Sequence, residues 1–301
     1  MDISEIWPPF ALHLQSDDME LSPVSEADIP ELAQIARGGV RRDGIEAFLV
    51  DWDSGTDEQV ARSLAQYHWS TRAKLTADEW TIEFTVRVNG RTIGVQGVNG
   101  HRFPLTRTVS TGSWLALPEQ GRGYGTRMRR MIIEGVTRYL AAAQSDTAYF
   151  DGNRASRRVS EKLGYSPNGN RNVVGQNGTA LTKHHMAPRS EDYVHTGRDL
   201  QVTGAEAFRT FPSQLLPDGG PATWREVAAP PSGSTKPDQH THTRIQAPHP
   251  RVNKKKRPCP RPEDQKQSLP QKILRQSLTL PQPPSCSTIS ANGLSYRDRN
   301  G

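Results

Sequence analysis

The sequence predicts a mixed α/β (α+β) domain with a mostly antiparallel sheet flanked by helices, followed by a tail that does not fold on its own. Three observations lead to this expectation. Alternating apolar runs flank an Asn89-Gly90 turn, a glycine-rich segment precedes a long amphipathic helix, and the composition changes beyond Pro230. We expect an N-terminal extension at 1–18, a folded domain at 19–211 and a Pro-rich, basic, disordered tail at 212–301.

The first elements of the domain are a short strand and two helices. Met19–Pro23 fits a strand, and Ser25 is a suitable N-cap for the helix that follows. A second helix is expected to begin at Thr56, because Gln59 three residues later completes a capping box. These signals are local, and they place both helices before the first long strand.

A β-hairpin and a further strand come next. Apolar and polar residues alternate over 80–88, which is the period of a half-buried strand. A second apolar run, 92–98, follows Asn89 and Gly90, and Asn-Gly between two such runs is a strong hairpin signal. A third strand is expected over 107–117, ending before Pro118.

The second half alternates helices with strands. The long helix has its apolar residues on one face: Met128, Met131, Ile132, Val136, Tyr139 and Leu140. A short strand is expected at 147–150 and a helix at Arg154–Lys162, ended by Gly164. Closing strands are expected at 173–174, 179–186 and 200–202.

The glycine-rich segment between strand and helix is the most informative part of the chain. Glycines let the backbone approach a ligand closely and adopt positive φ, and the free N–H groups at a helix start attract an anion. No Lys-Ser/Thr pair follows the glycines, so the segment is not a P-loop, and it lacks the Rossmann G-x-G-x-x-G spacing. The residues predict a pyrophosphate site; the alternative is a glycine-rich turn that binds nothing.

Two motifs in this region resemble those of a known family. Residues 120–125 (QGRGYG) resemble the Q/R-x-x-G-x-G/A motif of the GNAT acetyltransferases, and 153–165 (NRASRRVSEKLGY) resemble the second motif of that family. One helix and one strand separate the two motifs, as in the family. Residues 112–115 (GSWL) resemble the preceding strand of the RimJ/RimL-like branch. The resemblance covers about residues 20–208 and implies the acyl-CoA N-acyltransferase fold.

The resemblance implies acetyl-CoA as the cofactor and no metal. Backbone amides of the glycine segment would bind the coenzyme A pyrophosphate, the preceding strand would pair with the pantetheine arm, and Asn153 would hold the cofactor from the second motif. For Asn153 a helix N-cap is the alternative, and the two roles are compatible. The implied cofactor-binding residues are Leu115, Leu117, Gln120, Gly121, Arg122, Gly123, Tyr124, Gly125, Thr126 and Asn153.

The catalytic residues are less clear from the sequence. Ser160 stands where many family members have the tyrosine that protonates the leaving thiolate, and a serine is a far weaker acid. Ser160 is therefore either a hydrogen-bond donor or an ordinary helix residue. Candidate bases by residue type are Glu83, His101, Asp151 and Glu161, with Asp151 ranked first because it ends a strand beside the expected site.

The expected reaction is transfer of the acetyl group of acetyl-CoA to a primary amine, on a small molecule or a protein N-terminus, by direct attack in a ternary complex. Cys259 and Cys286 both lie in the tail, so the domain has no thiolate for a covalent acetyl-enzyme. One alternative is a catalytically weak acyl-CoA-binding regulatory module. The other is nucleic-acid or partner binding through the basic tail.

Charge and composition bound the partners and the compartment. The formal net charge is +6, part of it in the basic run 254–257, for which a solvated surface is the favoured interpretation over a nucleic-acid site. The N-terminus lacks a signal-peptide pattern and no run is apolar enough to span a bilayer, so we expect a cytoplasmic protein without a membrane partner. The oligomeric state is left open. The tail could be a linker, a partner-binding segment or the product of an altered reading frame.

Overall fold

The structure is a computed structural model that describes residues 1–188 and 200–214, with side chains described up to residue 211. Both cysteines, the basic run 254–257 and the predicted disordered tail beyond residue 214 lie outside the described residues. None of the helices in the described ranges combines the length and apolar character needed to cross a membrane.

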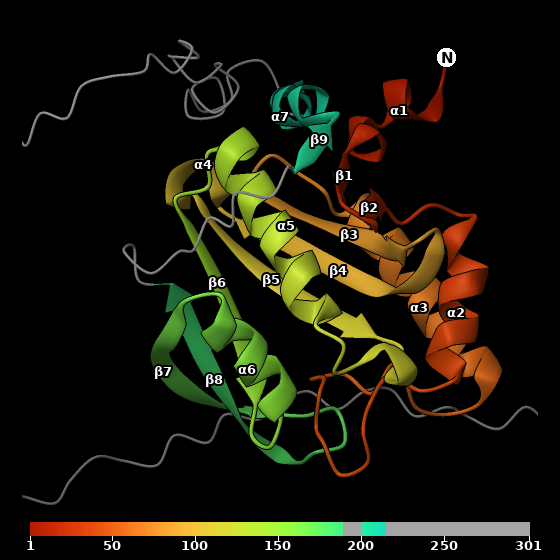
Figure 1. Cartoon of the computed structure of the whole chain (residues 1–301), viewed down its shortest axis with the longest axis vertical. Helices are drawn as coiled ribbons and strands as arrows, with labels where there is room; N and C mark the ends of the chain where they lie inside the picture. Colours follow the sequence, from red (N-terminus) through yellow and green to blue (C-terminus); the bar gives the residue numbers. More distant parts are fainter. Residues whose placement is uncertain (189–199, 215–301) are drawn as a thin grey trace, which may run out of the picture. The chain divides into compact units, whose positions relative to one another are not determined.

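A nine-stranded mixed sheet is the centre of the domain (Figure 1). Its strand order is β7-β8-β6-β5-β4-β3-β2-β1-β9, and β5–β6 is the one parallel pair among the described strands. The strands are β1 (His13–Ser16), β2 (Met19–Pro23), β3 (Glu79–Val88), β4 (Arg91–His101), β5 (Thr108–Leu115), β6 (Gln144–Phe150), β7 (Tyr165–Val174), β8 (Ala180–Pro188) and β9 (Gln201–Thr203). The prediction of a mixed, mostly antiparallel sheet is therefore confirmed.

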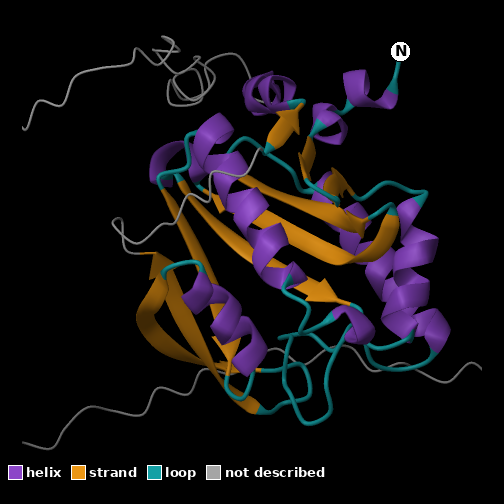
Figure 2. Cartoon of the chain, in the orientation of Figure 1, coloured by secondary structure: helices purple, strands orange, loops and turns teal. Residues whose placement is uncertain are grey.

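Helices lie on both faces of this sheet (Figure 2). Helices α2 and α3 pack against β4 and β3 on one face, while α5, α6 and α7 lie on the other. The helices are α1 (Ile3–Ile6), α2 (Asp28–Arg37), α3 (Asp57–Ala73), α4 (Phe103–Thr106), α5 (Tyr124–Leu140), α6 (Arg154–Lys162) and α7 (Ala205–Gln214), with 3-10 turns η1 (Pro8–Ala11) and η2 (Leu117–Glu119).

Alternation along the central strands separates the two faces. Ile82, Phe84 and Val86 belong to the large core beneath α5, so the residues between them point to the α3 face. Val95 and Trp114 pack instead with the buried residues of α2 and α3. The sheet face beneath α3 is the side on which Glu83, the candidate base of β3, lies.

Local sequence signals placed several elements correctly. Thr56 caps α3 in a complete capping box with Gln59, and the Asn89-Gly90 turn joins β3 to β4. The apolar stripe of α5 is buried as predicted, except that Tyr139 is only partly buried. Glycine is required at position 135 because α5 approaches β1 closely there, and a Cβ would lie 2.8 Å from Cδ2 of Leu14.

The predicted domain boundaries differ from the structure at both ends. Strand β1 lies within the proposed 1–18 extension and pairs with β2 and β9, so this segment is part of the sheet. The predicted end at residue 211 falls inside α7, which continues to Gln214. The strand predicted at 107–117 ends at Leu115, because residues 117–119 form η2.

Candidate functional site

Strands β5 and β6 pair over only half of their length. Their parallel ladder joins Thr108 to Gln144 and ends where Thr111 meets Thr147. Beyond this point, residues 112–115 pair only with β4, and residues 148–150 pair only with β8. We call this separation the splay; Figure 1 shows the two strands diverging below the middle of α5. An extended ligand can use the free strand edges as a further strand would.

The glycine-rich loop lies directly after the β5 arm of the splay. Gly121 and Gly123 have φ of +82° and +87°, a region that favours glycine. A Cβ at either position would meet no described heavy atom within 4 Å, so the space above the loop is open. Gly123 is the N-cap of α5 and contributes no side chain to satisfy the first helical amides. The loop therefore presents bare backbone to whatever approaches it.

Five consecutive amides of this loop are available to an anion. Among the hydrogen bonds of residues 1–188 and 200–214, none is donated by the backbone N–H of residues 121–125. The N–H of Thr126 differs, because it donates to the carbonyl of Gly123 at 3.1 Å. The positive end of the α5 dipole adds to the attraction, so residues 121–125 fit a pyrophosphate group.

Two buried polar atoms near the end of the β5–β6 ladder have no hydrogen-bond partner among the described residues. Gln96 is fully buried, and its Nε2 donates to the carbonyls of Gly97 and Gly112 at 2.9 and 3.0 Å. Its Oε1 and the Oγ1 of Thr111 have no hydrogen-bond partner among the described residues. Because an unpaired buried polar atom is costly, these two positions fit a polar ligand or an ordered water in the splay.

Several predicted cofactor residues act within the protein itself. The N–H of Leu117 donates to the carbonyl of Gly39 at 3.1 Å, so it is not free to bind a pantetheine arm. Gln120 Nε2 donates to the carbonyls of Val40 and Leu115 at 2.9 and 3.0 Å, which fixes the loop to the end of β5. The Leu115 side chain is buried beneath α5. The cofactor-binding roles of Leu115, Leu117 and Gln120 stay predictions.

Arg122, Arg127 and Asn153 lie in or beside the two motifs and differ in whether they face solvent or contact other protein groups. Arg122 is exposed and lies 3.5 Å from Glu119, so its charge remains close to the open loop. Arg127, which follows the glycine loop, pairs with Asp18 at 2.7 Å. Asn153 is the N-cap of α6, and its Oδ1 accepts the N–H of Ser156 at 3.1 Å. The N-cap interpretation of Asn153 is therefore confirmed, while its cofactor role is a prediction.

Ser160 occupies a buried position between α5 and α6. Its hydroxyl donates to the carbonyl of Ser156 at 3.1 Å and accepts a hydrogen bond from Nη1 of Arg129 at 2.9 Å. Both Ser160 and Arg129 are buried, and burial lowers the pKa of Arg129. This geometry favours the packing interpretation of Ser160 over a hydrogen bond to a leaving thiolate.

Asp151 lies just beyond β6 and forms a surface pair with His184 of β8. Its side chain is 68% exposed, and His184 also contacts Oδ1 of Asn170 at 2.9 Å and stacks on Tyr149. Since Tyr149 packs against residues of α5 and α6, this cluster lies on the face opposite α3. The role of Asp151 as a base stays a prediction.

The other three candidate bases have different surroundings. His101 and Glu161 are exposed and paired, with Glu79 at 2.8 Å and Arg157 at 2.7 Å respectively. Glu83 is partly buried on the α3 face of β3 and accepts a hydrogen bond from the hydroxyl of Tyr67 at 2.7 Å. Burial raises the pKa of Glu83 to about 7, against the lowering effect of this hydrogen bond. Glu83 therefore differs from the other candidates in its burial and its pKa.

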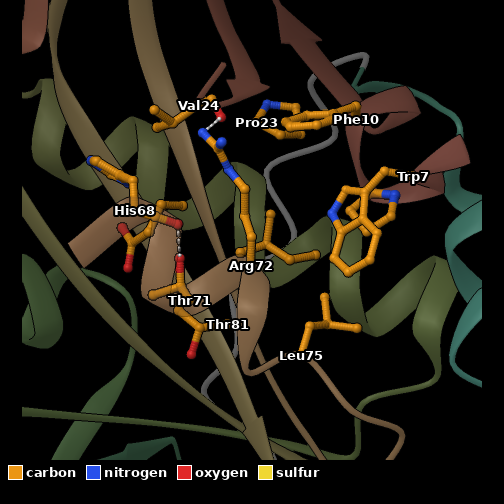
Figure 3. A pocket seen from close by; sticks show the side chains of 12 residues that line it. Trp7, Phe10, Pro23, Val24, His68, Thr71, Arg72, Leu75 and Thr81 are labelled. Carbon is orange, nitrogen blue, oxygen red and sulfur yellow. Dashed lines mark hydrogen bonds between the residues drawn. The ribbon is translucent and has the colours of Figure 1, made fainter. Parts of the chain in front are cut away.

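A pocket on the same face has Glu83 among its lining residues. Trp7 and Phe10 of the N-terminal segment also line it (Figure 3). Arg72 crosses it and donates to the carbonyl of Val24 at 2.8 Å, and its guanidinium lies 5.3 Å from the ring centre of Phe10. His68 is buried beside it, and burial lowers the pKa of His68 to about 4. The glycine loop contributes none of the lining residues, so this pocket is separate from the proposed pyrophosphate position.

The long loop between α2 and α3 contacts the glycine-rich loop, the β5 arm of the splay and the β7–β8 turn. Near its start it contacts the glycine-rich loop, where Nε of Arg42 donates to Oε1 of Gln120 at 3.1 Å. Further along it meets the β7–β8 turn, where the N–H of Gln176 donates to the carbonyl of Leu49 at 3.1 Å. Between these contacts Trp52 packs against Trp114 of β5, with the ring centres 5.5 Å apart and the ring planes tilted by 47°. The loop therefore lies beside the glycine segment and the splay together.

A sequence profile of the acetyltransferase (GNAT) domain matches residues 18–166, which include the splay and both motifs. Residues 18–166 form a GNAT acetyltransferase domain. The match confirms the predicted family, the enzyme class and acetyl-CoA as the acyl donor of this GNAT domain.

Solved structures with the same fold include Mycobacterium smegmatis RimJ in complex with CoA-disulfide, which is 17% identical, with a TM-score of 0.51. The match covers 69% of this chain and 96% of RimJ, and it shows the fold. A Salmonella typhimurium acetyltransferase that modifies the N-terminal serine of ribosomal protein L7/L12 is 16% identical, with a TM-score of 0.48 and coverage of 57% and 95%. RimL in complex with coenzyme A is 14% identical, with a TM-score of 0.45 and coverage of 56% and 94%.

Three features of the GNAT site were not predicted from the sequence. They are the contact of Tyr67 with Glu83, the two unpaired atoms of Gln96 and Thr111, and the contacts of the α2–α3 loop. The register of β4 and β5 brings Gln96 near Thr111, and sequence periodicity does not specify register between strands. An aromatic residue on a predicted helix gives no sequence signal that it will meet a carboxylate on a strand.

Proposed function

We propose that this protein transfers the acetyl group of acetyl-CoA to a primary amine, carried by a small molecule or by a protein N-terminus, through direct attack in a ternary complex. The family match supports acetyl transfer in general. The splay supports the finer statement, because it leaves the edge of β5 free beside an open anion site at the start of α5.

The chain's own residues would divide the work of binding. The amides of residues 121–125 bind the pyrophosphate, and the open space above Gly121 and Gly123 admits it without moving a side chain. The free edge of β5 binds the amide-bearing pantetheine arm in the manner of an added strand. Bound there, acetyl-CoA supplies an activated acetyl thioester.

The α3 side of the sheet is the direction from which the acceptor would approach. Gly112 begins the β5 arm of the splay, is exposed, and has open space where a side chain would stand. Helices α5 and α6 lie on the opposite face. Because the cofactor loop begins α5, cofactor and acceptor can be bound at the same time, which a ternary complex requires.

The single observation that carries the proposal is the bare glycine loop, and it gives a direct test. Gly123→Val places a side chain in the open space and strains a left-handed residue, so acetyl-CoA binding measured by calorimetry should fall at least about tenfold. Gly90→Val is the matched control, because Gly90 has a φ of +75° and equally open surroundings but lies in the distant β3–β4 turn.

The outcomes separate a binding defect from a folding defect. Both variants should lose similar stability, because each forces a β-branched residue into positive φ. Only Gly123→Val should lose acetyl-CoA affinity. Unchanged affinity in Gly123→Val, or an equal loss in Gly90→Val, would show that the loop does not hold the cofactor. Thiol release with a panel of primary amines then tests turnover by the wild-type protein.

A further inference from the structure

Glu83, Gly97 and Gly112 form one row across three neighbouring strands on the α3 face. Glu83 of β3 is the register partner of Gly97, and Gly97 is the register partner of Gly112 in β5. The carboxylate of Glu83 lies over Gly97, since a Cβ at Gly97 would be 2.6 Å from its Oε1. It is thus about one strand spacing, or about 5 Å, from Gly112 at the start of the splay.

Glycine at both positions keeps this row open. Any side chain at Gly97 would occupy the space of the carboxylate, and any side chain at Gly112 would stand between the carboxylate and the splay. The carboxylate therefore has a direct approach to an amine placed above Gly112, or an approach through one water molecule.

Tyr67 of α3 holds the carboxylate from the other side. Its hydroxyl donates to Oε1 of Glu83 at 2.7 Å, while its side chain remains half-exposed to solvent. Burial raises the pKa of Tyr67, and the nearby charge of Glu83 adds to this effect, so the hydroxyl stays protonated. Tyr67 thus connects a partly buried carboxylate to bulk water.

The charged groups around Glu83 leave its carboxylate without a salt bridge in the described part of the chain. On α3, Arg72 pairs with Glu26, and the lowered pKa of about 4 keeps His68 neutral near pH 7. On the same face of β3, Arg87 pairs with Asp28 of α2. With burial as the main influence, the pKa of Glu83 rises to about 7, which suits a group that gains and loses a proton near neutral pH.

We propose that Glu83 accepts the proton of the acceptor ammonium and that Tyr67 passes it to solvent. This inference rests on the proposed acetyl transfer. The amine enters as R–NH3⁺ and gives one proton to Glu83, which frees its lone pair for attack. As the C–N bond forms and the C–S bond breaks, the sulfur takes the bonding electron pair and the second proton. The products are the amide, the thiol and one proton released from Glu83.

Glu83→Gln tests this role with little change of shape. In the full chain, this variant should keep its acetyl-CoA affinity and lose about 10²- to 10⁴-fold in kcat, the usual contribution of general base catalysis. The wild-type kcat should rise with pH through about 7, which gives the pH–rate profile a rising limb. This limb should be absent from the profile of Glu83→Gln. Glu79→Gln is the matched control, because Glu79 is on the same strand but exposed and paired with His101.

Tyr67→Phe gives a second, graded test. Because the Tyr67 hydrogen bond lowers the pKa of Glu83, its loss should move the limb to higher pH. A carboxyl titration of Glu83 by carbon-13 NMR in the cofactor-free protein provides a readout that does not depend on turnover. It should give a pKa of about 7.

These outcomes distinguish two failures. If the wild-type protein neither binds acetyl-CoA nor releases thiol, the proposed function is wrong. If it does both, but Glu83→Gln keeps its rate and pH limb, the assignment of Glu83 is wrong and the acetyl transfer stands. A Glu83 carboxyl that titrates near the ordinary value of about 4.3 would also overturn the assignment.

Discussion

Replacing Ser160 with alanine separates a catalytic serine from a structural one. Ser160→Ala removes a hydrogen-bond acceptor of Nη1 of Arg129, a guanidinium that is buried and whose Nε has no partner among the described residues. The change also removes the hydrogen bond that the Ser160 hydroxyl donates to the carbonyl of Ser156, one turn earlier in α6. We therefore expect the main effect to be on stability.

The magnitude follows from the charge of the partner. A hydrogen bond to a charged group contributes about 1.5–3 kcal/mol, and a buried donor left unpaired costs a similar amount. A loss of about 2 kcal/mol in the free energy of unfolding corresponds to a fall of about 4–8 °C in Tm for a domain of this size. A serine that acts only in catalysis would leave Tm unchanged.

Thermal melting and steady-state kinetics on the same preparations measure both effects. Ser156→Ala is the matched control, because it is the same substitution one turn earlier at a partly exposed position. Ser160→Ala should melt several degrees lower than Ser156→Ala, with kcat within about twofold of wild type when assayed well below its Tm. The result that would refute this reasoning is a wild-type Tm combined with a kcat lowered tenfold or more.

Three further perturbations test other parts of the structure. Gly97→Ala should lower kcat without changing acetyl-CoA affinity, because the new Cβ would lie 2.6 Å from the Glu83 carboxylate and displace it; unchanged kinetics would contradict the placement of Glu83. A chain ending at Gln214 should keep the Tm of the full chain, whereas Phe208→Ala should lose about 3–5 kcal/mol by melting, since Phe208 is fully buried; equal Tm values for wild type and Phe208→Ala would count against the docking of α7. Replacing Cys259 and Cys286 together with alanine should leave turnover unchanged, and loss of activity would indicate a thiol step.

The elements that the sequence predicted well are those specified by neighbouring residues. The capping box at Thr56 and the Asn89-Gly90 hairpin each depend on a few consecutive positions, and both are present. Strand β7 was found only at its last two residues. It is an edge strand with mostly exposed side chains and a proline at 167, so the apolar alternation that marks a buried strand is missing.

Elements that depend on distant partners were not predictable in this way. Strand β1 is four residues long, and its position is set by pairing with β2 and with β9 near the other end of the domain. The site divides along the same line. The glycine loop was predicted because its chemistry lies in consecutive residues, while Glu83 was one of four candidates until the strand register placed it opposite Gly97.

The pairing of β1 with β9 means that this edge of the sheet can be completed only late in translation. Leu14 of β1 emerges early in translation, but its partner Val202 emerges only after eight strands have been synthesised. Until then one edge of β1 has exposed backbone groups that could pair with another nascent chain.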